Sequence, residues 1–230
     1  MAGKFSGLDA FWRRVPPVTF ALIAINVAVF LYELWLGSHG QLRQRAFAWK
    51  YSLSLEGLQH GSFWKLITFQ FLHGGWLHLL LNCWSIFIFG AALESVLGKA
   101  RYLRLYLLGG VAGGALQMLA AWLSDARFGG SVVGASAGVF ALIAGFTYIF
   151  PEARMTLLLF FVIPVRMTAN RMLTVAALIT VAGILWPSWL LGRHVAHVAH
   201  LGGLIAGLIV VRVFMREFRR ERELVPPVLG

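Results

Sequence analysis

Long apolar runs separated by shorter polar stretches dominate the chain, and they predict membrane-spanning helices. A helix needs about 20 mostly apolar residues to cross the hydrocarbon core of a bilayer. Six runs reach or approach this length, and most are bounded by proline or glycine, as helix ends often are. The runs lie at residues 18–36, 76–92, 102–123, 136–150, 172–186 and 195–213. The pattern therefore predicts an all-α membrane protein with six transmembrane helices.

Two segments interrupt this pattern. The connection 38–69 is long and mixed in polarity, and residues 155–163 are apolar but too short to span a bilayer. The second segment ends at Pro164, and we expect it to be interfacial. We divide the chain into an N-terminal tail (1–17), a six-span membrane domain (18–213) and a basic C-terminal tail (214–230).

Composition excludes an ordinary soluble domain. Hydrophobic residues make up 59% of the chain and charged residues 13%, whereas soluble domains have roughly 45–50% and about 25%. The mean hydropathy is +0.77. A cleavable signal peptide is not expected, because no small-residue cleavage site follows a short apolar core near the N-terminus. A single cysteine, Cys83, excludes an internal disulfide and a cysteine-based metal cluster.

The net charge of +11 is explained by topology rather than by nucleic acid binding. Cytoplasmic segments of membrane proteins carry the excess of lysine and arginine. If the N-terminus is inside, fourteen of these residues fall on inner segments and six on outer segments. We therefore expect both termini in the cytoplasm and no nucleic acid partner.

This topology gives the second, fourth and sixth spans the same direction, so their first turns lie at one depth near the outer face. Those turns contain His78 and Asn82 on the second span, Ser136 on the fourth and His200 on the sixth. Polar and ionisable groups inside spans are costly and usually functional. The matching depth of four such residues predicts a site shared by three helices.

The chemistry that these residues allow is nucleophilic catalysis. A serine hydroxyl becomes a useful nucleophile when a base within hydrogen-bond reach takes its proton, and histidine is the usual base. Ser136 and His200 meet if their helices pack closely, and small residues such as Gly203 and Gly207 permit that approach. Gly134 allows a tight turn just before the nucleophile.

The fourth span is short, which places its beginning below the outer surface. A helix over residues 136–150 is about 22 Å long, less than the roughly 30 Å of hydrocarbon. The preceding residues would then dip into the membrane, and irregular backbone at that depth is tolerated inside protein or beside a water-filled cavity. A hydrolase needs such a cavity, because water is its second substrate.

An acyl transfer also develops an oxyanion that needs hydrogen-bond donors. We assign the backbone N–H of Ser136, at a helix N-terminus, and the side chains of His78 and Asn82, which lie four residues apart on one helix face. Of the acidic residues, Asp125 and Glu56 are the two expected near the outer face, and neither has a spacing that indicates contact with His200. The sequence therefore predicts a Ser–His dyad.

Simpler interpretations compete with this one. Ser136 precedes an apolar run and has the position of a helix N-cap. His78 and Asn82 have the spacing of an interhelical hydrogen-bond pair. The run of His194, His197 and His200 suggests a metal site, but its spacing spreads the side chains over about 120° of a helix, and the His-Glu-x-x-His signature is absent. We expect no metal and no other cofactor.

The ordered set of these motifs resembles the rhomboid intramembrane serine proteases. The resemblance covers residues 64–207. Its motifs are Trp64-Lys65, His73, His78 with Asn82, Glu94 with Gly98 and Arg101, a glycine-rich third span, Gly134-Ala135-Ser136, and Ala199-His200 with Gly203 and Gly207. It implies Ser136 as nucleophile, His200 as base, His78 and Asn82 as oxyanion donors, and a first connection partly within the membrane.

Three residues depart from the pattern of many rhomboids. Ala137 replaces the glycine that often follows the serine, and Phe140 replaces a tyrosine that stacks on the catalytic histidine. Lys65 stands where arginine is usual, and lysine lacks the planar fork of arginine. None of these departures removes a reacting group.

The resemblance implies an endopeptidase of a bacterial inner membrane that cleaves single transmembrane segments, with its site opening to the outer face. Two other functions compete with it. One is a catalytically silent rhomboid-like protein that binds membrane clients, and the other is a small transporter using intramembrane histidines. A transporter predicts a symmetric pair of broken helices, which the sequence lacks.

Overall fold

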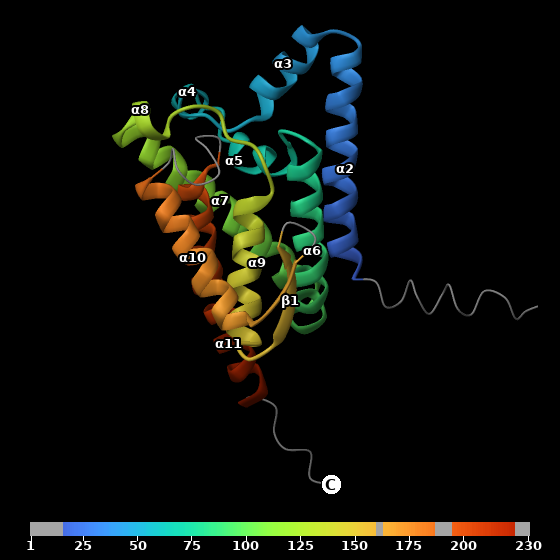
Figure 1. Ribbon diagram of the computed structural model, residues 1–230, viewed down its shortest axis with the longest axis vertical. Helices are drawn as coiled ribbons and strands as arrows, with labels where there is room; N and C mark the ends of the chain where they lie inside the picture. The colour runs from blue at the N-terminus through green and yellow to red at the C-terminus, as the bar shows by residue number, and fades with distance from the viewer. Residues whose placement is uncertain (1–15, 160–162, 187–194, 224–230) are drawn as a thin grey trace, which may run out of the picture.

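The computed structural model describes residues 16–159, 163–186 and 195–223, and helices make up most of this part. Six apolar helices form a bundle and run roughly along its long axis (Figure 1). They are α2 (Pro17–Ser38), α6 (Trp76–Leu97), α7 (Lys99–Leu123), α9 (Ser136–Ile149), α10 (Ala169–Leu185) and α11 (His197–Glu223). Four of them, α2, α6, α7 and α11, are long and apolar enough to cross a membrane. The helices α9 and α10 are shorter, with 14 and 17 residues.

The ends of these helices lie close to the limits expected from the apolar runs, with two exceptions. Helix α6 was expected to end at residue 92 and reaches Leu97. Helix α11 continues beyond the expected end of the membrane domain at Val213 and reaches Glu223. Phe214 is buried, so the beginning of the basic tail packs against the bundle.

Short helices fill the long first connection and the loop before α9. They are α3 (Gln41–Tyr51), α4 (Leu55–Gln59), α5 (Lys65–Thr68), the 3₁₀ turn η1 (Phe69–Phe71) and α8 (Asp125–Phe128). Among them, α3, α4 and α8 lie at one end of the bundle (Figure 1). Leu53 pairs with Val132 in an isolated antiparallel bridge, with N···O distances of 3.0 and 2.7 Å. This bridge ties the first connection to the loop that precedes α9.

The described residues of the segment expected to be interfacial, 155–163, lie in two paired strands. Strand β1 (Arg154–Leu159) pairs antiparallel with β2 (Ile163–Thr168), with Arg154 opposite Thr168 and Leu159 opposite Ile163. Met155 and Met167 lie opposite each other and pack against the core of the bundle. Alternation of these apolar residues with exposed ones explains the strands, because successive side chains of a strand point to opposite faces.

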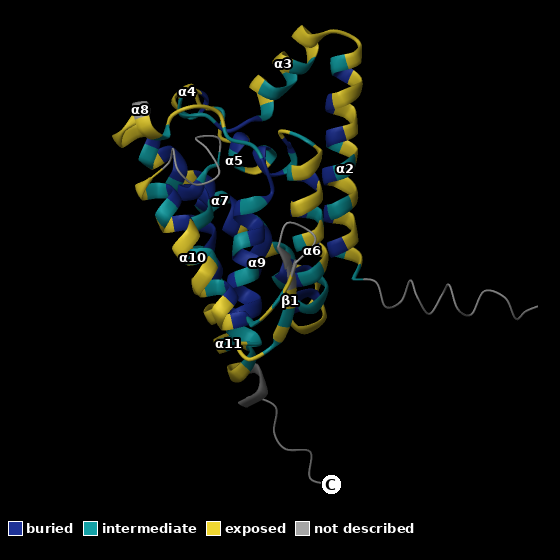
Figure 2. Cartoon of the chain, in the orientation of Figure 1, coloured by how far each residue is buried: buried dark blue, intermediate teal, exposed yellow. Residues whose placement is uncertain are grey.

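Helices α7, α9 and α11 form the centre of the bundle, and most residues of α9 are buried (Figure 2). Small residues let these helices approach closely. A Cβ added at Gly109 would collide with Ala141, and one added at Gly203 would collide with the backbone of Ala137. By contrast, α2 exposes much of its surface, as expected for a helix at the edge of a bundle that faces lipid (Figure 2).

A buried carboxylate on α6 secures the first turn of α2. Glu94 accepts hydrogen bonds from the backbone N–H groups of Val18 (3.0 Å) and Thr19 (2.7 Å) and from the Thr19 hydroxyl (2.9 Å). The first N–H groups of a helix have no partner within the helix, and a negative charge there is favoured by the helix dipole. Glu94 therefore acts as a cap supplied by a neighbouring helix.

We expect Glu94→Ala to lower the free energy of unfolding by about 2 kcal/mol or more, because it leaves buried donors without an acceptor. Glu94→Gln, which keeps one acceptor oxygen, should lose less. Thermal unfolding in detergent measures both changes, with Ser95→Ala at the exposed neighbouring position as control. Equal Tm values for Glu94→Ala and Ser95→Ala would contradict this assignment.

Candidate active site

Ser136 is the first residue of α9, and its hydroxyl contacts the imidazole of α11. Its Oγ lies 2.8 Å from Nε2 of His200. The N-cap position belongs to Ala135, and no side chain caps this helix. The N-cap interpretation of Ser136 is therefore wrong, and the hydroxyl is instead paired with a base.

The backbone turns sharply just before Ser136. Gly134 has a φ of 124°, a conformation that residues with a side chain rarely adopt. Its N–H donates to the carbonyl of Phe69 at 2.9 Å. A Cβ at Gly134 would lie only 2.6 Å from Nε2 of His78, so glycine here also makes room for that ring.

Packing between α9 and α11 holds the His200 ring. Phe140, one turn after Ser136, stacks on this ring with a centroid distance of 4.2 Å and an interplanar angle of 8°. Gly203 and Gly207 face the backbone of Ala137 and Ala141 on α9. Close approach of the two helices at these glycines brings the serine and the histidine within hydrogen-bond distance.

Among the residues that the structure describes, no carboxylate is hydrogen-bonded to the His200 ring. Of the two candidates from the sequence, Glu56 lies on the short helix α4, and the side chain of Asp125 lies outside the described part.

His78 lies beside Gly134, and one of its ring nitrogens accepts a hydrogen bond. The N–H of Gly74 donates to its Nδ1 at 3.4 Å, so in the neutral ring Nε2 carries the proton. Nε2 and Cε1 are each 2.6 Å from the place of a Cβ at Gly134, two residues before Ser136, whereas Nδ1 is 3.8 Å from it. The Nε2 side of the His78 ring therefore faces the turn that precedes Ser136.

Asn82, one turn further along α6, is buried and bonded within its own helix. Its Nδ2 donates to the carbonyl of His78 at 2.9 Å. The amide thus lies on the same helix face as His78, and this bond leaves its second N–H hydrogen available. The hydrogen bonds described for this pair, to Gly74 and within α6, do not join two helices.

Two buried polar residues near His78 were not assigned to the site from the sequence. Glu33 of α2 has 8% of its surface exposed, and its Oε2 is buried without a hydrogen-bond partner among the described residues. The His73 ring lies 5.1 Å from that of His78. The expectation that only Asp125 and Glu56 lie near this end of the bundle was therefore wrong. A carboxylate inside the apolar run 18–36 was the available signal, because such groups are usually functional.

His73 lies in the connection between η1 and α6, outside the spanning helices. Burial lowers the pKa of its ring to about 4, and repulsion from His78 adds to the effect. The ring is therefore uncharged at neutral pH. This neutral state suits a position next to a second histidine, since two charged rings would repel each other.

Lys65, at the position where rhomboids usually have arginine, is buried with 2% of its surface exposed. Its Nζ donates to the carbonyl of Trp49 at 2.8 Å and lies 4.9 Å from the Trp49 ring centroid. A carbonyl and an aromatic face stabilise the ammonium group through a hydrogen bond and a cation–π contact. Lysine thus joins α3 to α5 without a planar guanidinium.

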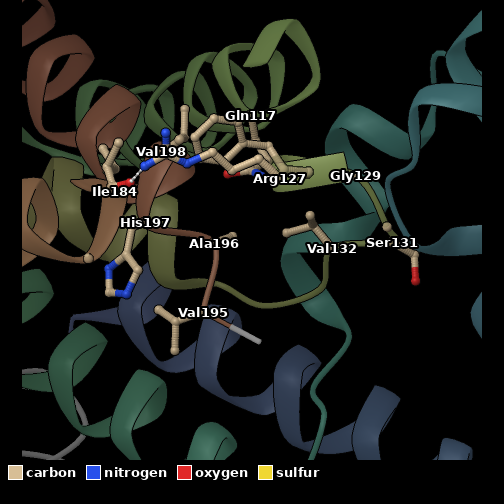
Figure 3. Close-up of a pocket in the computed structure, with 13 residues that line it drawn as sticks. Gln117, Arg127, Gly129, Ser131, Val132, Ile184, Val195, Ala196, His197 and Val198 are labelled. Atoms are coloured by element: carbon tan, nitrogen blue, oxygen red, sulfur yellow. Dashed lines mark hydrogen bonds between the residues drawn. The ribbon is translucent and has the colours of Figure 1, made fainter. Parts of the chain in front are cut away.

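A cavity of about 490 Å³ lies beside the first turn of α11 (Figure 3). Its lining includes the buried His197, which lies one turn before His200. The ring centroids of the two histidines are 5.9 Å apart.

Two polar side chains of the cavity bond to neighbouring backbone. Gln117 on α7 accepts from the N–H of Ala199 at 3.2 Å. Arg127 donates to the carbonyls of Ile184 and Leu185 at the end of α10, at 2.5 and 3.1 Å. His194, the third member of the histidine run, lies outside the described residues.

The chain is an integral membrane protein, because four of its described helices are long and apolar enough to cross a membrane. Inside its helical bundle it holds a polar site, where a serine of one helix meets a histidine of another. The sequence profile of the Rhomboid domain family matches residues 60–217. This match covers more than half of the chain, and the protein belongs to the rhomboid family.

Relatives with assigned names agree with this family. YdcA of Bacillus subtilis, whose name places it among the rhomboid proteases, is 38% identical over 110 residues, which cover 48% of this chain and 53% of YdcA. Mitochondrial Rhomboid protein 1 of Saccharomyces cerevisiae is 27% identical over 241 residues, covering 97% and 63% of the two chains. Rhomboid protease GlpG of Yersinia pestis is 26% identical over 211 residues, covering 90% and 66%. The chain thus spans between about half and two thirds of the length of these relatives.

Proposed function

We propose that the protein is an intramembrane serine endopeptidase that hydrolyses peptide bonds in or near transmembrane segments. The observation that carries this proposal is the 2.8 Å contact between the Ser136 hydroxyl and Nε2 of His200. A serine paired with histidine is the arrangement that acyl transfer requires. The names of the relatives as rhomboid proteases support the same chemistry.

The reaction follows from the positions of these groups. His200 Nε2 takes the proton of Ser136 as Oγ attacks the carbonyl carbon of the scissile bond. The oxyanion that forms is bound by the backbone N–H of Ser136, at the start of α9, and by the side chains of His78 and Asn82. The tetrahedral intermediate collapses as protonated His200 gives its proton to the leaving amine, and an acyl-enzyme remains.

Water completes the turnover. His200 takes a proton from a water molecule, which attacks the ester carbonyl and releases the carboxylic acid, and the proton returns to Ser136 Oγ. The stacked ring of Phe140 keeps the imidazole in one orientation through both steps. No metal or cofactor takes part in this proposed mechanism.

We further propose six spans with both termini in the cytoplasm and the site near the outer face of a bacterial inner membrane. This topology follows from the distribution of lysine and arginine. Helix α9 has 14 residues, a length of about 21 Å, and is too short to cross the roughly 30 Å of hydrocarbon. Its N-terminus, with Ser136, would lie below the outer surface, where a transmembrane substrate can reach it from the lipid.

Cleavage and labelling of the purified protein in liposomes test the proposal. A single-span substrate should be cut, and a fluorophosphonate probe should modify the peptide that contains Ser136. Because both reactions use the same hydroxyl, residual cleavage should fall in proportion to the labelled fraction. Cleavage that persists at full labelling of Ser136 would contradict the proposal. Binding of the substrate with neither cleavage nor labelling would favour a silent client-binding protein.

A further inference from the structure

A buried glutamine on α7 bonds to the residue that precedes His200. Gln117 has 5% of its surface exposed. Its Oε1 accepts from the backbone N–H of Ala199 at 3.2 Å, and its Nε2 donates to the carbonyl of Phe128 at 3.1 Å. Ala199 is the third residue of α11, and the first N–H groups of a helix have no partner within the helix. Gln117 therefore caps the first turn of α11 from a neighbouring helix.

The two bonds of Gln117 explain why an amide stands at this position. One partner is a donor and the other is an acceptor, and an amide offers both a carbonyl oxygen and an NH₂ group. Phe128 ends α8, from which the chain leads to α9. One side chain of α7 thus joins the start of α11 to the loop that precedes Ser136.

One turn earlier, at Gly113, α7 contacts the neighbours of both reacting residues. A Cβ added at Gly113 would collide with the carbonyl oxygen of Ala199, which precedes His200. The same Cβ would lie 2.7 Å from Cβ of Ala137, which follows Ser136. Helix α7 therefore touches α9 and α11 beside the contact between the serine and the histidine, and the relative position of the two helices depends on α7.

Packing alone does not account for Gln117. An apolar side chain would fill the same space, but it would leave the N–H of Ala199 and the carbonyl of Phe128 without these partners, and an unpaired buried group is costly. The place of the bond links it to the reaction. Because Ala199 is joined covalently to His200, the position of its backbone determines where the imidazole lies relative to Ser136.

We propose that Gln117 is a positioning residue for the proposed proteolytic reaction. By holding Ala199 against α7, it keeps Nε2 of His200 at 2.8 Å from Oγ of Ser136. Reacting groups must be held closely in place, because a shift of about 1 Å costs up to roughly 100-fold in rate. The inference rests on the proposed function, and it adds a role for α7, which supplies none of the reacting groups.

Two variants of α7 disturb Ala199 in different ways. Gln117→Met keeps the length of the side chain without a donor or an acceptor. Gly113→Ala removes no hydrogen-bonding group and pushes a Cβ against the carbonyl oxygen of Ala199. For a single-span substrate in liposomes, we expect kcat to fall roughly tenfold or more in both variants with an unchanged KM, because the base is displaced while the substrate binds as before. Fluorophosphonate labelling of Ser136 should slow by a similar factor.

Thr147→Val is the matched control. Thr147 is a buried residue of α9, and its hydroxyl donates to the carbonyl of Ala169 on α10 at 3.3 Å. The substitution removes a buried bond between two helices, as Gln117→Met does, but at the opposite end of α9 from Ser136. It should lower the Tm and leave kcat, KM and labelling at their wild-type values.

Amide hydrogen exchange gives a measurement that does not depend on activity. The N–H of Ala199 should exchange faster in Gln117→Met than in the wild type and in Thr147→Val, because it has lost its acceptor. All proteins are compared at temperatures where each is fully folded. If Gln117→Met does not fold, Gly113→Ala carries the kinetic test, because it keeps the bond and displaces the same residue.

Each result decides one of the two proposals. Wild-type kcat and labelling in folded Gln117→Met would overturn the role of Gln117, and so would a raised KM with an unchanged kcat. An equal loss of kcat in Thr147→Val would also overturn it, since the loss would then reflect stability. A wild-type protein that neither cleaves nor is labelled, with faster exchange at Ala199 in Gln117→Met, would contradict the proposed function and leave the bond's hold on α11 intact.

Discussion

Alanine at Ser136 or at His200 should reduce cleavage to the background level, and the double variant should be no worse than either single one. The hydroxyl and the imidazole are 2.8 Å apart, and under the proposed function they act as one unit, so that removing one makes the other useless. Effects of residues that act together are strongly non-additive, and each single loss should be about 10³-fold or more. We expect this result for hydrolysis of a single-span substrate in liposomes.

Exposed residues of the same types provide matched controls. Ser95→Ala and His39→Ala change an exposed hydroxyl and an exposed imidazole whose hydrogen bonds are to their own helices and not to Ser136 or His200. Both should cleave at the wild-type rate and be labelled at Ser136 by a fluorophosphonate. A double variant that loses a further order of magnitude beyond the single ones would show that the two residues act independently and would contradict the dyad.

Gly203→Ala should also remove most of the cleavage activity, although it changes neither Ser136 nor His200. A Cβ at this position would collide with the backbone of Ala137, the residue that follows Ser136. Backbone atoms cannot rotate away, so α11 must move from α9 and the hydroxyl must separate from His200. A displacement of about 1 Å is enough for a loss of roughly 100-fold. The Tm should fall as well, because the central contact of the bundle is opened.

The control for this variant lies two residues further on α11. Ile205 is 48% exposed on the outer surface of the bundle, and Ile205→Ala should leave cleavage unchanged. Two quantities are measured for each variant: cleavage of the substrate, and fluorophosphonate labelling of Ser136, which reports the reactivity of the hydroxyl directly. Full labelling of Gly203→Ala would mean that the distance between the helices does not control the reaction.

Much of the fold follows from the sequence because its dominant signals are long and periodic. Each apolar run of roughly the bilayer thickness forms a helix, since no other arrangement satisfies its backbone in lipid. The meeting of Ser136 with His200 was predictable for a related reason. Glycines at 203 and 207 indicated the face on which α11 approaches another helix, and His200 lies on that face.

Other features depend on contacts that a linear pattern does not reveal. The pairing of β1 with β2 is not visible in the sequence, because no turn signal such as Asn-Gly stands between the two strands. The burial of the Glu33 carboxylate and of the Lys65 ammonium group is another example. The ammonium group donates to the carbonyl of Trp49, which lies 16 residues earlier in the chain.

The distance along the chain between Ser136 and His200, 64 residues, has a consequence for biosynthesis. Ser136 is translated with α9, whereas His200 follows with α11, after α10. Under the proposed function, a nascent chain that stops before α11 has a serine without its base and cannot cleave its neighbours at the translocon. The enzyme becomes competent only once α11 has packed against α9.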